Sequence, residues 1–418
     1  MMKNIVLGLC VALLMSQAVE ADDWPGWRGP NRDGISLETG LLQSWPQEGP
    51  KLAWQIDAIG GGYSTPAVAG DRLYLLANVG MEDEYVKALD GKDGRTIWSV
   101  RIGRVGVPDQ RPSYPGSRGM PTIDGDLLYA LGSDGDLVCL ETATGKKRWH
   151  VNFQQAFGSE PPRWAWSESP LIDGDKLICS PGGANATILA LDKLTGEILW
   201  KTATEEADLA GYGSPVAATI AGVRQYVVFL AQGVVGVNAE SGEFLWRYAK
   251  TAEGSPANIL TPIIDGDRVY TGSNRGGGGL VRVQLDEDSP VAEIYHGQKM
   301  PGHVGGAVLI NGRLYGSTRT ALLCVDFESG DVAWTDRSVG PATVGYADNR
   351  LYVVGDEGEI ALVDISGDAY REVGRFTPPG RVEAGTSWTY PVVANGRMYI
   401  RHLEKMWAYD VGAEPAGH

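Results

Sequence analysis

Short apolar runs alternate with tight polar turns along most of the chain. The segment at 189–200, LALDKLTGEILW, is an apolar run, a polar turn and a second apolar run that ends in Trp200. The preceding segment at 170–178, PLIDGDKLI, has the same form. Short apolar runs that flank turn residues predict β-hairpins. Each pair of such segments therefore predicts four consecutive antiparallel strands.

This pair of hairpins recurs through the sequence. The first hairpin phrase occurs eight times, for example as TPIIDGD at 261–267. A repeat of about 50 residues that contains four strands predicts the blade of a β-propeller, because one blade alone cannot bury its faces. We therefore predict an all-β fold, an eight-bladed propeller of four-stranded antiparallel blades over residues 50–412. Copies of the second phrase end at Trp98, Trp149, Trp200, Trp246 and Trp334, and a weaker copy runs to Phe376.

The two ends of the repeat region complement each other. The eighth repeat supplies three strands between Thr389 and Asp410, and its fourth strand is missing. The segment PKLAWQID at 50–57 has the form of that strand, with Trp54 at the place of the other repeat tryptophans. We predict that N- and C-terminal strands share the last blade and close the ring, which also removes open sheet edges.

Positions within the second phrase have mechanical explanations. A glycine such as Gly94 or Gly145 stands where a hairpin turn needs a positive φ, which glycine adopts without strain. A tryptophan that ends the outer strand can pack between adjacent blades and donate its indole N–H. We expect this structural docking role for Trp54, Trp98, Trp149, Trp200, Trp246 and Trp334.

The net charge and the chain termini indicate which partners and which cellular location to expect. The net charge of −16 argues against nucleic acid and anionic membrane surfaces as partners, because both attract basic surfaces. Residues 1–21 have the form of a signal peptide, with Lys3, a short apolar core and a cleavage site at 19–21. We expect a periplasmic or secreted monomer without a membrane span in the mature chain. Residues 22–49, rich in tryptophan, predict a strap over the propeller surface, and residues 413–418 a C-terminal tail.

Cysteine and histidine usage points to neither disulfides nor metal. Cys139, Cys179 and Cys324 each lie within an apolar run, so we expect buried thiols. The chain has five histidines, and none stands at ligand spacing from another. We therefore expect no metal site.

The pattern Ala-x-Asp-x-x-Thr-Gly-x-x-x-Trp, as at 190–200, resembles the tryptophan-docking repeat of the PQQ-like propellers. That superfamily contains quinoprotein alcohol dehydrogenases and the propeller scaffold of bacterial outer-membrane protein assembly. The segment DDWPGWRGPNRDGIS, with GGYSTPAV and VRQYVVF, is similar to secreted bacterial PQQ-binding-like repeat proteins. The dehydrogenases bridge adjacent cysteines over their cofactor, and some carry a haem domain. Here no two cysteines are adjacent and no CxxCH motif is present.

Long connections between blades predict where a binding site lies. In a four-stranded blade, the turns within each hairpin lie on one face, and the crossing connections lie on the other, where function usually resides. Two long connections bring these residues toward the mouth of the funnel: Arg111, Arg118, Arg163, Trp164, Trp166 and Glu168. Equivalent places before other inner strands hold Tyr63, Tyr212, Asn258, His303 and Trp388.

Two interpretations of these residues stay open. Aromatic faces, guanidinium groups and a carboxylate at a channel mouth suit a planar or anionic small ligand, or a sugar. The same residues also suit rim packing, with an arginine stacked on a tryptophan or paired with Glu168.

Three functions are compatible with the sequence. The first is an exported binding or assembly scaffold without catalysis or cofactor, with protein partners or a small ligand at the funnel face. The second, implied by the resemblance, is a PQQ-dependent alcohol or sugar dehydrogenase that holds PQQ with calcium. In that hypothesis Trp166 or Trp388 is the stacking floor, Arg118 binds a cofactor carboxylate, and Glu168 or His303 is the base. Tyr63, Tyr212 and Asn258 would also contact the cofactor. The third is a carbohydrate-binding propeller.

Overall fold

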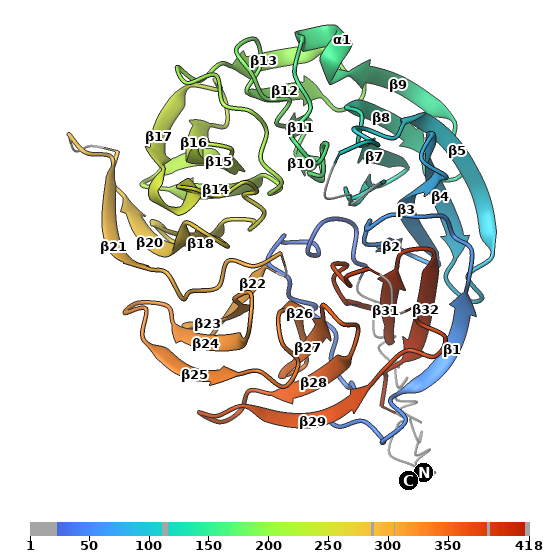
Figure 1. The fold of residues 1–418 in the computed structure, drawn as a ribbon. Coiled ribbons are helices and arrows are strands. Elements are labelled where there is room, and N and C mark those ends of the chain that lie inside the picture. Colours follow the sequence, from blue (N-terminus) through green and yellow to red (C-terminus); the bar gives the residue numbers. More distant parts are fainter. Residues whose placement is uncertain (1–22, 111–115, 286–287, 305, 383–384, 414–418) are drawn as a thin grey trace, which may run out of the picture.

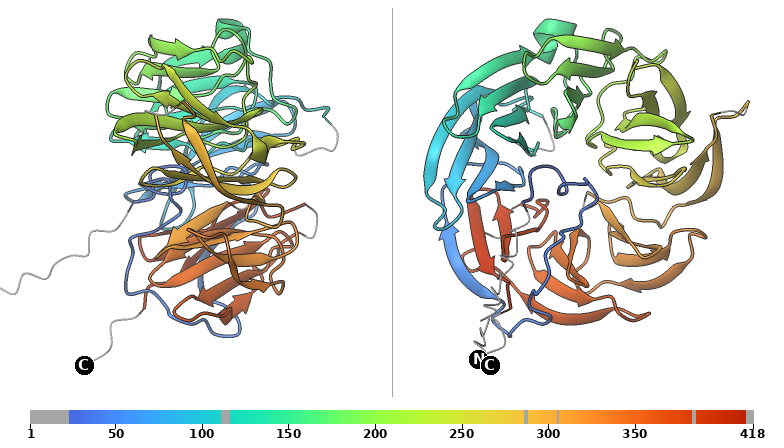
Figure 2. Two further views of the ribbon diagram at one scale, coloured as in Figure 1. Left: turned by 90° about the vertical axis from the view of Figure 1, so that its left-hand side faces the viewer. Right: turned by 180° about the vertical axis from the view of Figure 1, so that it is seen from behind.

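The chain forms a ring of β-sheet blades around a central axis (Figure 1). The computed structural model describes residues 23–110, 116–285, 288–304, 306–382 and 385–413. The predicted signal peptide, residues 1–21, and residues 414–418 of the predicted tail lie outside the described residues. Within the described residues there are eight four-stranded antiparallel sheets, which confirms the predicted all-β, eight-bladed propeller. Seen from the side, the ring is a thick disc (Figure 2).

The first four blades follow one another along the chain. Blade 1 consists of β2 (Ala67–Ala69), β3 (Arg72–Val79), β4 (Asp83–Asp90) and β5 (Thr96–Arg104). Blade 2 consists of β6 (Thr122–Asp124), β7 (Leu127–Leu131), β8 (Asp136–Glu141) and β9 (Lys147–Asn152). Blade 3 consists of β10 (Leu171–Asp173), β11 (Lys176–Cys179), β12 (Ile188–Asp192) and β13 (Ile198–Thr202). Blade 4 consists of β14 (Val216–Ile220), β15 (Val223–Leu230), β16 (Gly233–Asn238) and β17 (Phe244–Tyr248).

The remaining blades complete the ring. Blade 5 consists of β18 (Ile263–Asp265), β19 (Arg268–Ser273), β20 (Gly277–Val283) and β21 (Val291–Gly297). Blade 6 consists of β22 (Ala307–Ile310), β23 (Arg313–Ser317), β24 (Leu322–Asp326) and β25 (Val332–Asp336). Blade 7 consists of β26 (Ala342–Ala347), β27 (Arg350–Gly355), β28 (Ile360–Asp364) and β29 (Arg371–Phe376). Blade 8 consists of β30 (Val392–Ala394), β31 (Arg397–His402), β32 (Lys405–Asp410) and β1 (Lys51–Ile56).

The described residues contain two short helices outside the sheets: α1 (Phe153–Phe157) after blade 2 and the 3₁₀ helix η1 (Lys250–Ala252) after blade 4. Neither of them has the length and apolar character needed to cross a membrane.

The ring closes by pairing the two ends of the chain. The β1 strand pairs antiparallel with β32, with Lys51 opposite Asp410 and Ile56 opposite Met406. This confirms the prediction that the terminal strands share one blade. The buried thiols were also predicted: Cys139, Cys179 and Cys324 are free and buried.

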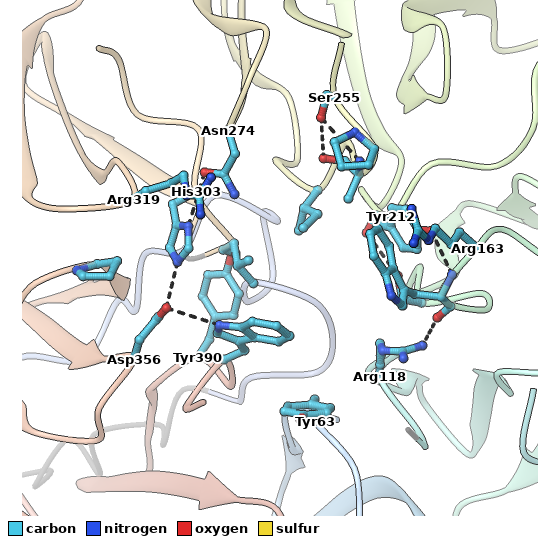
Figure 3. A pocket seen from close by; sticks show the side chains of 18 of the residues that line it. Tyr63, Arg118, Arg163, Tyr212, Ser255, Asn274, His303, Arg319, Asp356 and Tyr390 are labelled. Atoms are coloured by element: carbon cyan, nitrogen blue, oxygen red, sulfur yellow. Dashed lines mark hydrogen bonds and ion pairs between the residues drawn. The ribbon is translucent and has the colours of Figure 1, made fainter. Parts of the chain in front are cut away.

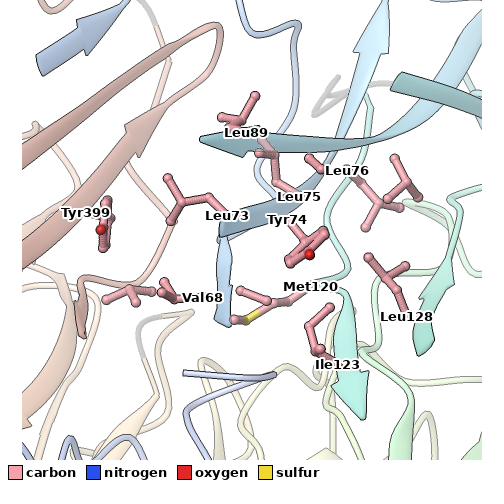
Figure 4. Packing of buried hydrophobic residues seen from close by; sticks show 14 of the residues in the cluster. Val68, Leu73, Tyr74, Leu75, Leu76, Leu89, Met120, Ile123, Leu128 and Tyr399 are labelled. Atoms are coloured by element: carbon pink, nitrogen blue, oxygen red, sulfur yellow. The ribbon is translucent and has the colours of Figure 1, made fainter. Parts of the chain in front are cut away.

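Apolar side chains fill the space between neighbouring blades. Figure 4 shows this layer where blades 8, 1 and 2 meet, with Tyr399, Leu73 and Leu128 in one cluster. The middle strands carry most of it, since in β3 six consecutive residues are buried. Outer strands alternate exposed and half-buried positions over much of their length because one of their faces meets solvent.

Three of the repeat tryptophans join their own blade to the next. Each donates its indole N–H to a backbone carbonyl that follows the turn acid of that blade. Each ring also lies over the turn glycine: a Cβ on Gly145, whose φ is +73°, would be 2.8 Å from the Trp98 ring. Only glycine therefore fits this turn. The hydrogen bonds are Trp54 to Gly91 (2.9 Å), Trp98 to Thr142 (3.0 Å) and Trp149 to Lys193 (2.9 Å).

The other repeat tryptophans differ in their hydrogen bonds or contacts. Trp246 donates to Gln225 of its own blade at 2.7 Å. The Trp200 ring also lies over the turn glycine of the next blade, Gly242, and stacks on Tyr226, but its indole N–H has no hydrogen-bond partner in the described part of the chain. The Trp334 rings lie against two tyrosines, Tyr315 and Tyr370. Blade 5 has no repeat tryptophan, and there Tyr295 lies over the turn glycine Gly330 of blade 6.

The predicted strap crosses one face of the ring. It begins at blade 1, where Trp24 and Val68 exchange two backbone hydrogen bonds, and reaches blade 7, where Ser36 donates to Tyr346. The strap also contacts a hairpin turn: the Asp23 carboxylate accepts a hydrogen bond from the backbone N–H of Gly70, in the turn between β2 and β3. The strap therefore lies on the face of the hairpin turns and crosses the end of the central channel (Figure 1).

Candidate functional site

A cavity of about 710 Å³ lies on the opposite face, at the mouth of the central channel. We call it the funnel. Every one of the eight connections that lead into an inner strand contributes to its lining, and so do three loops between second and third strands. The strap contributes its floor through Trp27. The connections contribute Tyr63, Arg118, Trp164, Tyr212, Ala257, His303, Pro341 and Trp388, and the loops contribute Asn274, Arg275, Arg319 and Asp356.

Aromatic residues line the funnel in pairs. Tyr63 and Trp388, which precede blades 1 and 8, have ring centroids 5.4 Å apart. Trp164 and Tyr212, which precede blades 3 and 4, are 6.1 Å apart. At the floor, Trp27 meets Tyr390 edge to face at 4.9 Å. Trp27 is fixed by an indole hydrogen bond of 2.7 Å to Thr261 Oγ1.

One wall of the funnel is organised by Arg118 (Figure 3). Its guanidinium donates to the carbonyl oxygen of Trp164, whose own backbone N–H donates to the Tyr212 hydroxyl at 3.1 Å. Behind it lies Glu84, whose carboxylate accepts two hydrogen bonds from Ser133. Burial raises the pKa of Glu84 and lowers the pKa of Arg118, while the attraction between the two favours both charges.

The facing wall holds a histidine and a carboxylate. His303 Nε2 lies 3.0 Å from Asp356 Oδ2, and His303 Nδ1 lies 3.3 Å from Asn274 Oδ1. Trp388 Nε1 donates to the same Asp356 oxygen at 3.4 Å. The other oxygen, Asp356 Oδ1, is buried and accepts no hydrogen bond from the described residues. These side chains come from four blades and meet only in the ring.

Five of the residues predicted to contact a ligand line the funnel: Tyr63, Arg118, Tyr212, His303 and Trp388. Arg163 and Trp164 also line it, with the Arg163 guanidinium 4.8 Å from the centre of the Trp164 ring. Arg111 lies outside the described residues.

Three other candidates are not among the lining residues. Trp166 is 1% exposed, packs against Phe153 and donates to the Pro181 carbonyl. Its ring therefore belongs to the core between blades 2 and 3, and it cannot form the floor of a ligand site. Asn258 is 2% exposed, and its side-chain amide donates to two backbone carbonyls at the end of β15. These bonds hold the connection into blade 5 in place, so the side chain does not face a ligand.

Glu168 is the third candidate away from the lining. It is 3% exposed and accepts a hydrogen bond of 2.6 Å from the Ser180 N–H. Burial raises the pKa of its carboxyl to about 7. The buried guanidinium of Arg32, from the strap, attracts this carboxylate, and burial lowers the pKa of Arg32 to about 9. Arg32 itself donates to the carbonyl of Ser169 at 2.8 Å. Glu168 therefore lies in the packed interior beside the strap rather than facing a ligand.

Some lining residues were not predicted from the sequence. Asp356 follows β27 in an ordinary-looking turn, and Arg319 follows β23 in another. The signal that could have found them is position alone, since second-to-third-strand loops share the face of the crossing connections. Trp27 lies in the strap, and nothing in its local sequence indicates that it reaches the funnel.

The donor set of the funnel suits an anion better than calcium. Among the described lining residues there are four guanidinium groups and one carboxylate, on a chain whose net charge is −16. Calcium takes six to eight oxygen ligands in proteins, several of them carboxylates. Within the described residues, no three His, Cys, Asp or Glu side chains come close enough to hold a metal ion. The residues present therefore do not fit the calcium that accompanies PQQ in quinoprotein dehydrogenases.

Comparison with known proteins gives one family and several partial relatives. The family model described as outer membrane protein assembly factor BamB matches residues 36–104 and 82–336. The protein of that name from Burkholderia pseudomallei is 24% identical over 277 residues, which cover 56% of this chain and 69% of that protein. The dehydrogenase subunit of the quinone alcohol dehydrogenase from Komagataeibacter europaeus is 28% identical over 196 residues, or 44% of this chain.

This chain matches only part of the length of these relatives. The match covers 26% of the dehydrogenase subunit. The serine/threonine-protein kinase AfsK from Streptomyces griseus is 28% identical over 174 residues, which cover 40% of this chain and 19% of that protein.

Solved structures share the fold. BamB from Moraxella catarrhalis aligns with a TM-score of 0.63 at 16% identity, covering 86% of this chain and 99% of that one. The quinohemoprotein alcohol dehydrogenase from Comamonas testosteroni aligns with a TM-score of 0.65 at 14% identity, covering 95% and 81%.

Proposed function

The chain belongs to the propeller family whose model is described as outer membrane protein assembly factor BamB, and on that premise we propose that it is an exported binding and assembly scaffold of the cell envelope. One observation carries the proposal. The strap covers one end of the channel, and all eight connections converge on the other end to form a single funnel. A ring with one open, lined face is suited to holding a partner there.

The proposed location is the periplasm or the cell exterior. The form of residues 1–21 supports export, and the membership of the outer-membrane assembly factor family supports a location in the cell envelope. The proposed partner is a protein, or a small ligand, that docks at the funnel face. The net charge of −16 supports neither nucleic acid nor an anionic membrane as partner.

A quinoprotein-like alcohol or sugar dehydrogenase is the second candidate function. The observation that favours it is the 28% identity to the quinone alcohol dehydrogenase subunit over 196 residues. The donor set of the funnel speaks against it, because one carboxylate beside four guanidinium groups is a poor calcium site.

A paired experiment separates the two functions. Purified residues 22–418 are supplied with PQQ and calcium, and the reduction of a dye acceptor is followed over a panel of alcohols and sugars. In parallel, the tagged chain and an Arg163→Glu/Arg319→Glu variant are used to co-purify partners from the native envelope. The scaffold function predicts no PQQ-dependent dye reduction, and a partner that the wild type retains and the variant loses. Dye reduction that requires PQQ would favour the dehydrogenase instead.

A further inference from the structure

We propose that the funnel binds an acidic saccharide, a short sugar chain that carries carboxylate or sulfate groups. This inference rests on the proposed function only in taking the funnel as the binding face. It adds the chemical class of the ligand, which neither the fold nor the family match provides.

The charge of the funnel is opposite to that of the rest of the molecule. Arg118 and Arg163 lie on one wall and Arg319 on the facing wall (Figure 3), next to the loop that carries Arg275. Guanidinium groups bind carboxylate and sulfate through two parallel N–H donors. Cations on facing walls favour a ligand with more than one anionic group over a single ion.

Two of these cations are available to a ligand. Arg275 stands at the tip of the loop between β19 and β20, and Arg319 at the tip of the loop between β23 and β24. Both are exposed, and neither donates a hydrogen bond or forms an ion pair within the described residues. A funnel built for packing alone would not need two such groups at its mouth.

The lining of the funnel also favours a ligand that carries hydrogen-bond donors. Asp356 Oδ1 is buried without a donor, while its other oxygen is shared by His303 and Trp388. Asp356 lines the funnel, and its carboxylate is an acceptor to which a ligand hydroxyl can donate. A plain dicarboxylate or polyphosphate brings acceptors only. A sugar acid brings both hydroxyl donors and anionic groups.

The aromatic pairs supply faces for sugar rings. Tyr63 with Trp388 and Trp164 with Tyr212 present flat apolar surfaces on two sides of the cavity. The C–H face of a pyranose packs on such a surface, whereas its hydroxyls stay free to bond at the edges. Acidic peptides match the charge, but aspartate and glutamate side chains have no hydroxyl donor and no rigid ring. The volume of about 710 Å³ is that of a small-molecule site, enough for a short oligosaccharide.

Calorimetry with matched sugars tests the proposal. The probes are trigalacturonate, its fully methyl-esterified form, a sulfated heparin tetrasaccharide and hexaglutamate. We expect saturable binding of trigalacturonate or of the sulfated sugar, and the stronger of the two identifies the anionic group. Binding should weaken at least about tenfold between about 50 and 300 mM salt, since it depends on ion pairing. The methyl ester, which differs from trigalacturonate only in charge, should bind at least about tenfold more weakly.

Variants locate the site. Arg275→Ala/Arg319→Ala should lower the affinity at least about tenfold, because both guanidinium groups are lost. The matched control is Arg282→Ala, an exposed arginine at the other end of β20, which should bind like the wild type. Both variants change exposed residues, and their tryptophan fluorescence should match the wild type.

Several results would overturn the proposal: no binding of either acidic sugar, equal binding of the methyl ester, equal or tighter binding of hexaglutamate, or full affinity in the double variant. If acidic sugars fail while the envelope partner still co-purifies, this inference falls and the scaffold function stands. If sugars bind while no partner co-purifies, the assembly role with a protein partner falls and the ligand class stands.

Discussion

Arg401 Nη1 donates a hydrogen bond of 2.8 Å to the carbonyl oxygen of Ser64, and so ties the last blade to the first. The side chain is fully buried, and burial lowers its pKa to about 9, so it is charged at neutral pH. Backbone carbonyls take up all five of its N–H donors, which makes it a clasp at the point where the ring closes. The remaining acceptors are Leu76, Gly60, Gly61 and Leu403.

Replacing this clasp should destabilise the closed ring. Arg401→Met removes five charge-assisted hydrogen bonds and leaves buried carbonyls unpaired, so we expect a loss of about 3–5 kcal/mol in the free energy of unfolding. Urea denaturation followed by tryptophan fluorescence measures it. Arg282→Met, at an exposed position, is the control and should change stability by less than about 0.5 kcal/mol. An Arg401→Met protein as stable as the control would show that the clasp contributes nothing to closure.

Blade docking makes a separate prediction. Trp149 donates to the Lys193 carbonyl of the next blade and covers Gly196 there. Trp149→Ala should cost about 3 kcal/mol, at the low end for a tryptophan because the ring is half-buried. Trp149→Phe keeps an aromatic ring and loses the hydrogen bond, so it should cost about 1 kcal/mol. Thermal unfolding of the three proteins gives this order, and equal midpoints would refute the docking role.

The sequence repeat made the ring of blades predictable, and the irregular blades show which packing details the repeat does not predict. Glycine at a turn with positive φ and tryptophan at a strand end are local requirements, and both can be read from residue type and spacing. Blade 5 departs from the pattern because Tyr295 takes the place of tryptophan against Gly330. Trp246 turns into its own blade to bond Gln225. Such choices depend on the neighbouring blade, which the repeat alone does not describe.

The buried Glu168 predicts how stability depends on pH. Its pKa is raised by burial to about 7, above the ordinary 4.5 that it has in the unfolded chain. Between these values the folded state holds a proton that the unfolded state has lost, so this contribution is fully present below pH 4.5 and is lost as pH rises through 7. The difference is on the order of 3 kcal/mol. Glu168→Gln stays uncharged and still accepts from Ser180.

The measurement is the free energy of unfolding of the wild type and Glu168→Gln at about pH 5 and about pH 8. The free energy of unfolding of Glu168→Gln, relative to that of the wild type, should increase from the lower to the higher pH. The control is Glu240→Gln, at an exposed position, which should show the same pH dependence as the wild type. If Glu168→Gln also follows the wild type at both pH values, Glu168 is ionised in the folded state without cost.

The strap makes a local prediction. The Val68 N–H donates to Trp24 at 2.8 Å and the Tyr346 N–H donates to Gly34 at 3.0 Å, so both amides depend on the strap. A chain that begins at residue 37 should lose protection of these two amides against hydrogen exchange, because no acceptor replaces the missing one. The Val227 amide, on the middle strand β15 of blade 4 and away from the strap, is the internal control. Unchanged protection at Val68 and Tyr346 would mean that the strap does not hold the inner strands.

The funnel was predictable in position and only partly in content. Tyr63, Tyr212 and Trp388 precede inner strands, and the topology of a blade alone brings those places to one face. Side-chain direction was not predictable: Trp164 lines the funnel, while Trp166, two residues later, turns into the core. His303 and Asp356 are 53 positions apart in sequence and belong to different blades, so their pairing exists only in the folded ring.

The most direct test of the central claim, that the funnel is the binding face, is photo-crosslinking in cells of the native organism. A benzoylphenylalanine replaces Tyr212, whose ring lines the funnel, or Leu194, a turn residue of the opposite face that is 61% exposed. We expect a discrete adduct from position 212 and none from position 194. Adducts from position 194 with none from position 212 would contradict it and place the binding face on the hairpin turns.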